Sequence, residues 1–247
     1  MAALIVLNRH PESRSLSGRS GLGRGFGPGV ALAALVVFVA RATATDTNAV
    51  ISGWLAAQSN IQTWEADFKQ TRTLKTLTKP LIASGHLRFA SPDRFRWELL
   101  APSQTIALRD ADQMWVIYPM LKRAERYRFD EKTSGEWRET LSLLEAGFPR
   151  NRAELASRFH VVSILETNGN WQLALQPSSA FARKLMRQIT VGLATNDYAL
   201  TSTELEFVDG SRMRNDFTNA VYNPKVEENI FKWKPGEEFK VTEPLGR

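Results

Sequence analysis

The stretch that decides the fold is Phe89-Ala-Ser-Pro-Asp-Arg-Phe-Arg-Trp-Glu-Leu99. From residue 94 onward its charged and apolar side chains alternate: one side carries Arg94, Arg96 and Glu98, and the other carries Phe95, Trp97 and Leu99. This period of two is typical of an antiparallel strand with one face in water and one in an apolar interior. Pro92-Asp93 predicts a turn from a preceding strand over 85–89. The pattern therefore predicts a wide apolar interior, filled either by core side chains or by a ligand.

Residues 1–44 have the features of a presequence. Four arginines between residues 9 and 24 form a basic region, Val30 to Ala40 is an apolar run of 11 residues, and Ala42-Thr43-Ala44 is a small-residue cleavage site. Eleven residues are too few for a membrane-spanning helix, which needs about 20. The alternatives are an uncleaved anchor, or a start codon upstream of a shorter signal. We expect cleavage near Ala44 and an exported domain over residues 45–247.

The composition argues against several classes of function. The chain carries 32 basic and 26 acidic residues; residues 1–44 contribute five Arg and one Glu, which leaves 27 basic and 25 acidic residues in the exported domain. This near balance, without a block of like charge, is poor support for nucleic-acid binding. The absence of cysteine excludes disulfides, thiolate zinc sites, Cys nucleophiles and the N-terminal lipid of bacterial lipoproteins. We expect a soluble, monomeric protein of the Gram-negative periplasm.

Periodicity predicts one long sheet with helices at its start and in its middle. A helical pattern covers 46–61, and further helical patterns at 134–145 and 151–157 interrupt the strands. The short connections between strands force antiparallel neighbours. The expected fold is mainly β, an unclosed antiparallel barrel of about 10–11 strands with an α-helical lid. A loop is expected over 177–182, and strands are expected at 64–71, 81–89, 94–100, 104–110, 113–118, 122–129, 159–166, 170–176, 187–193, 199–208, 211–218 and 229–233.

The sequence contains almost no catalytic signal. It has no G-x-S-x-G elbow, P-loop or H-E-x-x-H motif. The exported domain has two histidines, His86 and His160, without a carboxylate at metal-ligand spacing, and Asp110 and Asp112 fit a turn better than a catalytic pair. We therefore expect no enzyme activity, cofactor or metal. All seven tryptophans lie in the exported domain, which is typical either of core packing or of a pocket for apolar ligands such as acyl chains.

A series of short motifs resembles the periplasmic outer-membrane lipoprotein carrier family, LolA. The motifs are Trp64-x-Ala66-x-Phe68-x-Gln70, Gly85-x-Leu87-x-Phe89, Pro92-x-x-Phe95-x-Trp97, Asp110 to Trp115-Val-Ile-Tyr118-Pro119, Phe217-x-Asn219, Asn223-Pro224 and Phe231-x-Trp233-x-Pro235. They follow the family order and cover nearly all of residues 46–243.

This resemblance implies a carrier that holds lipoprotein acyl chains in an apolar cavity. It would receive them from an inner-membrane ABC-type complex and pass them to an outer-membrane acceptor. Phe95 and Trp97 match aromatic cavity residues of the family, and Leu141, Leu144 and Phe148 lie in the equivalent lid. We also assign Phe89 and Trp115 to the cavity and Trp54 to the lid.

One departure from the family concerns the residue before Pro92. Close relatives of the best-known carrier have a basic residue there that ties the lid to the barrel, whereas this chain has Ser91. The departure leaves open a carrier of another lipid, and a periplasmic domain that senses a lipid is a second alternative. An enzyme on this scaffold is a third, but it would need an inward-facing titratable cluster that the alternation does not predict.

Overall fold

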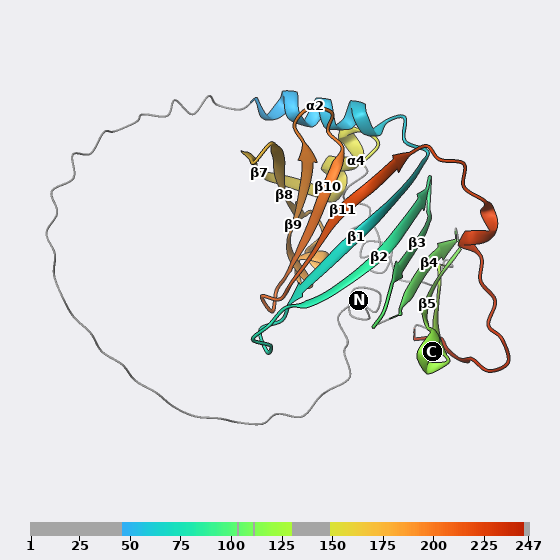
Figure 1. Ribbon diagram of the computed structural model, residues 1–247. Helices are drawn as coiled ribbons and strands as arrows, with labels where there is room; N and C mark the ends of the chain where they lie inside the picture. Colours follow the sequence, from blue (N-terminus) through green and yellow to red (C-terminus); the bar gives the residue numbers. More distant parts are fainter. Residues whose placement is uncertain (1–45, 103, 111, 130–148, 245–247) are drawn as a thin grey trace, which may run out of the picture.

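The computed structural model describes residues 46–102, 104–110, 112–129 and 149–244 (Figure 1). The predicted presequence and the predicted helix at 134–145 lie outside the described residues. The helices are α2 (Thr47–Gln58), α4 (Arg152–Arg158) and α5 (Ala180–Arg183), with 3-10 turns η1 (Pro119–Leu121) and η3 (Glu228–Phe231). The strands are β1 (Thr63–Thr73), β2 (Leu81–Ala90), β3 (Arg94–Leu99), β4 (Ile106–Asp110), β5 (Gln113–Tyr118), β6 (Arg123–Arg128), β7 (Phe159–Thr167), β8 (Asn170–Pro177), β9 (Met186–Ala194), β10 (Leu200–Phe207), β11 (Arg212–Tyr222) and β12 (Lys240–Thr242).

The strands form one sheet in the order β12-β6-β5-β4-β3-β2-β1-β11-β10-β9-β8-β7. Two antiparallel meanders, β1–β6 and β7–β11, are joined by the long pairing of β1 with β11. The end strands β12 and β7 do not pair with each other, so the sheet is unclosed. The predicted fold class is confirmed. The sheet has 12 strands because three residues of the polar tail add β12, in parallel, to the edge of β6.

The hairpin of β2 and β3 confirms the predicted turn at Pro92-Asp93. In its register Phe89 lies opposite Phe95, and Gly85 lies opposite Leu99. A Cβ at Gly85 would lie 2.1 Å from the carbonyl oxygen of Glu98 and 2.4 Å from the ring of Phe68. Glycine is required here because the neighbouring strand and the ring occupy the space of any side chain.

We call the side of the sheet that carries Phe95 and Trp97 the inner face. Cross-strand partners point to the same side of an antiparallel sheet, so the register extends this face over all the meander strands. Helices α2 and α4 pack on it through one large apolar cluster, and Figure 1 shows α2 across the ends of the strands of the second meander. Its helix residues are Val50, Ile51, Trp54, Leu55 and Leu155. Asp46 and Asn151 cap the two helices by accepting hydrogen bonds from the backbone N–H groups of Asn48 and Glu154.

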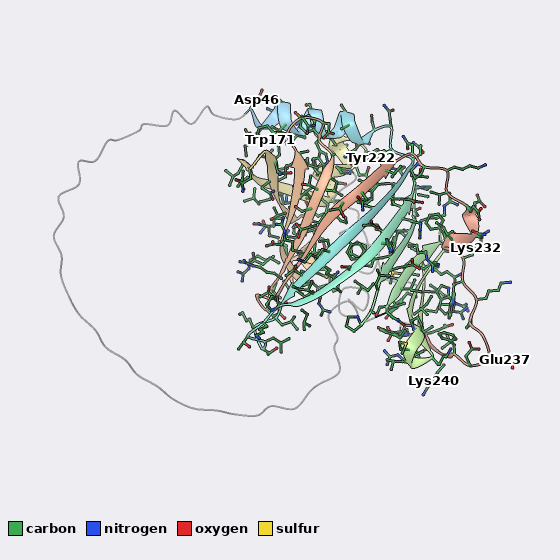
Figure 2. All side chains as sticks on the ribbon, viewed as in Figure 1. Asp46, Trp171, Tyr222, Lys232, Glu237 and Lys240 are labelled. Atoms are coloured by element: carbon green, nitrogen blue, oxygen red, sulfur yellow. The ribbon has the colours of Figure 1, made fainter. Side chains whose placement is uncertain are left out.

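The opposite side, the outer face, has its own apolar cluster over β4–β6. Leu108, Trp115, Ile117 and Ala124 are buried there beneath side chains of the C-terminal tail. The tail runs along this side of the molecule between Lys232 and Lys240 (Figure 2). Both faces of β5 are therefore buried.

Two predicted elements are wrong. Residues 229–233 do not form a strand: the segment crosses the outer face of β3 and β4 as η3 because Phe231 is buried and Arg96 binds the carbonyl oxygen of Ile230 (Nη1···O 3.0 Å). The expected loop at 177–182 contains α5, which begins after Ser179 because its Oγ caps Ala182 N (3.3 Å).

Candidate functional site

The inner face carries a group of half-buried aromatic side chains where β2 meets β3. Phe89 lies opposite Phe95, and Trp97 lies two residues further along β3, opposite Leu87. All three rings are partly exposed, whereas the neighbouring Phe68 is fully buried, with its ring centroid 4.2 Å from that of Trp97. We call Phe89, Phe95 and Trp97 the aromatic patch. It offers a large apolar surface without using the fully buried core.

Trp115 does not belong to this patch, and its assignment to the cavity is corrected. It pairs with Leu108, which pairs with Arg96, so its side chain lies on the outer face. There its ring meets Trp233 edge-on, with centroids 5.0 Å apart, and the guanidinium of Arg126 lies 5.4 Å from its centroid. Trp115 therefore anchors the C-terminal tail.

Of the predicted lid residues, the structure describes Trp54 alone. Its ring is fully buried in the inner cluster. A Cβ on the preceding residue, Gly53, would lie 2.3 Å from the ring of Tyr198. The backbone of α2 therefore packs directly against this ring. Leu141, Leu144 and Phe148 lie outside the described residues, and their assignment stays a prediction.

Two arginines flanking Asn151 tie the start of α4 to its surroundings, one to the rim of the sheet and the other to α2. Arg150 Nη2 donates to Oγ of Ser91 (2.9 Å), the residue at which this chain departs from the family. Arg152 donates to Asn48 Oδ1 (3.1 Å) and Ser52 Oγ (3.0 Å) on α2. No local pattern in the sequence predicts the first of these contacts, because Arg150 and Ser91 are 59 positions apart. With serine at residue 91, the rim of the sheet is thus still joined to the α4 segment, and Arg150 supplies the positive charge.

Several polar side chains on the inner face pair with one another. Gln70 Nε2 donates to Asn215 Oδ1 (3.0 Å) beneath the sheet surface. At the β6 end, Glu125 accepts from Tyr127 (2.6 Å) and Arg123 (2.8 Å), and burial and Glu125 raise the pKa of Tyr127 well above its usual range. In the described part of the chain, no three His, Cys, Asp or Glu side chains are placed to hold a metal ion.

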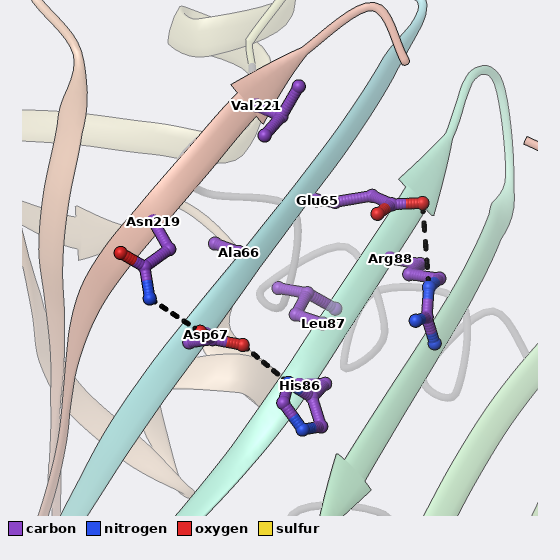
Figure 3. Close-up of a pocket in the computed structure, with 8 residues that line it drawn as sticks. All are labelled: Glu65, Ala66, Asp67, His86, Leu87, Arg88, Asn219 and Val221. Atoms are coloured by element: carbon purple, nitrogen blue, oxygen red, sulfur yellow. Dashed lines mark hydrogen bonds and ion pairs between the residues drawn. The ribbon is translucent and has the colours of Figure 1, made fainter. Parts of the chain in front are cut away.

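The outer face has a small pocket of about 80 Å³ where β11, β1 and β2 lie side by side (Figure 3). Asp67 lies at its centre and binds His86 Nδ1 through Oδ1 and Asn219 Nδ2 through Oδ2 (2.7 Å). Asn219 sits in a bulge of the β1–β11 pairing with a φ of 52°, a left-handed conformation that Asn tolerates better than most residues. The pocket is polar and open, unlike the aromatic patch.

Asp67 makes stability depend on pH. The hydrogen bond from Asn219, then that from His86, lowers the pKa of Asp67 below its usual value. A lowered folded-state pKa stabilises the protein above the unfolded pKa, near 3.9, and this stabilisation is lost as pH falls through the folded value. We expect the free energy of unfolding of wild type to fall more than that of Asp67→Asn as pH is lowered from 7 to 5 and 3. Urea unfolding at the three pH values measures it. Parallel pH dependence of the two proteins would contradict this.

Comparison with known proteins agrees with the motifs. The family profile "Outer membrane lipoprotein carrier protein LolA" matches residues 59–234. An outer-membrane lipoprotein carrier protein of Bordetella avium is 24% identical over 87% of this chain and 92% of its own. Another, of Albidiferax ferrireducens, is 26% identical over 71% and 82%.

Solved structures show weaker likeness. A LolA superfamily protein from Nitrosomonas europaea aligns with a TM-score of 0.40 and 8% identity, over 75% of this chain and 97% of its own. An uncharacterized conserved protein from Thermus thermophilus aligns with a TM-score of 0.47 and 8% identity, over 79% and 98%. Because the profile covers residues 59–234, well over half of the chain, the chain belongs to the outer membrane lipoprotein carrier protein LolA family.

Proposed function

We propose that this protein is a non-enzymatic periplasmic carrier, which shields the acyl chains of lipoproteins on the inner face and delivers them to the outer membrane. Residues 1–44 are removed as a signal peptide, and residues 45–247 act as a monomer. An inner-membrane ABC-type complex supplies the cargo, and an outer-membrane acceptor takes it. Family membership supports the carrier role. Among the described residues, no helix is long and apolar enough to cross a membrane.

The observation that carries the proposal is the half-buried aromatic patch beside a fully buried core. Core aromatics such as Trp54 and Phe68 have at most 2% of their surface exposed, whereas Phe89, Phe95 and Trp97 keep part of theirs accessible. Acyl chains suit such a surface because each buried CH₂ contributes about 0.8 kcal/mol and requires no polar partner. The charges of β2 and β3 lie on the outer face, where Arg88 and Arg96 surround Glu98. The charges of these two strands therefore point away from the patch.

The test combines binding with transfer. Residues 45–247 should bind a fluorescent acyl probe that brightens in apolar surroundings, and should move a labelled lipoprotein from donor vesicles to acceptor vesicles. Failure to bind the probe would leave core packing as the explanation of the aromatics. Binding without transfer would favour a lipid-sensing domain.

A further inference from the structure

The inner side of the molecule contains indole N–H groups without hydrogen-bond partners. Among the described residues, no acceptor lies within reach of the buried Nε1 atoms of Trp54, Trp97 and Trp171. All three residues belong to the inner apolar cluster or pack against it. Gln70 on the same face is paired with Asn215. Arg123 Nε, also on this face, lacks a partner among the described residues as well, so an indole donor bears on cargo binding only where it lies in the aromatic patch.

An unpaired buried donor is unfavourable. Leaving one without an acceptor costs free energy, and native proteins contain few of them. A phenylalanine would provide a similar ring without this cost. Where such a donor lies in a surface suited to hydrocarbon, an acceptor on the bound cargo would recover the loss.

Trp97 is the donor best placed to meet such an acceptor. Trp54 is a fully buried residue of α2. Trp171 lies on β8, far from β3 in the strand order and on the opposite side of the molecule from Lys232 (Figure 2), so it is not part of the aromatic patch. Trp97 belongs to the aromatic patch and is half-buried. Its neighbours on the inner face, Leu87 opposite and Phe95 beside it, have no polar side-chain atoms. A chain that displaces these contacts brings its own polar atoms to the indole.

We propose that Trp97 Nε1 donates a hydrogen bond to a carbonyl oxygen of the cargo. The patch then selects acyl chains attached through ester or amide groups over chains of equal length attached through ethers, whose oxygen is a weaker acceptor. This inference rests on the proposed carrier function. It assigns Trp97 a role in specificity in addition to its apolar area.

The experiment compares a 1,2-diacylglycerol with the 1,2-dialkylglycerol ether of the same chain length, each displacing the fluorescent acyl probe. Wild type should bind the ester about three- to tenfold more tightly, the value of one neutral hydrogen bond. Trp97→Phe should bind the ester more weakly and lose the preference for it over the ether. Trp115→Phe is the matched control: it also removes a buried, unpaired Nε1, but on the outer face, so the preference should persist.

The possible results separate the two proposals. Equal affinity of wild type for ester and ether, or a preference that survives in Trp97→Phe, would overturn the role of Trp97 and leave the carrier function standing. If neither lipid displaces the probe and the probe itself does not bind, both proposals fail. The comparison in wild type does not depend on the folding of any variant.

Discussion

Replacing Trp115 by alanine is expected to lower the free energy of unfolding by about 3–5 kcal/mol, the usual range for a buried tryptophan. Trp115 is 4% exposed, and its ring lies between the outer face of β5 and Trp233 of the tail. The smaller side chain leaves a cavity and also loosens the contact that holds the tail. Urea unfolding followed by circular dichroism measures the loss.

Trp233→Ala tests the same contact from the other partner. The two losses should be less than additive in the double variant, because each substitution removes the same ring pair. Phe239 lies beyond Trp233 in the same cluster, with ring centroids 5.2 Å apart, so Trp233→Ala also uncouples Phe239. Wild-type stability of Trp115→Ala would show that the tail does not form a second core.

The sequence predicted which side chains share a face wherever one side of a strand is polar. In β3 the alternation of Arg and aromatic residues assigns the two faces correctly, because the charged and the apolar side chains separate cleanly between them. In β5 the run Met-Trp-Val-Ile is apolar at every position, so its period does not show which side is inner. The period therefore could not exclude Trp115 from the cavity. The tail that buries it lies more than 100 residues later in the chain.

The tail itself was only partly predictable. Phe231 and Trp233 are spaced like residues of a strand, and no local signal shows that the segment crosses a sheet instead of joining one. β12 has three residues without alternation, and its pairing with β6 depends on where the tail is anchored. Turn and cap residues were more informative, because Asp46, Asn151 and Pro92-Asp93 act through their immediate neighbours.

The largest functional effect is expected from Phe95→Asp, which should weaken binding of the acyl probe at least tenfold. The substitution removes an aromatic ring from the patch and places a carboxylate where the cargo would bury it, and an unpaired charge is strongly disfavoured in apolar surroundings. Phe95 is half-buried, so water still reaches the new side chain in the empty protein. Arg109, directly opposite on β4, already faces Asp93 (Nη2···Oδ1 3.6 Å), so it does not fully neutralise the new carboxylate.

Fold and function can be separated with a control on the other face. Gln113→Asp places the same carboxylate on β5 with the parity of Trp115, away from the patch, and should leave probe binding unchanged. Circular dichroism of both variants shows whether the sheet is intact. If Phe95→Asp folds and binds the probe as wild type does, the aromatic patch is not where cargo binds. Loss of binding in both variants would point to a general electrostatic effect of the added charge. A local effect at the patch would weaken binding only in Phe95→Asp.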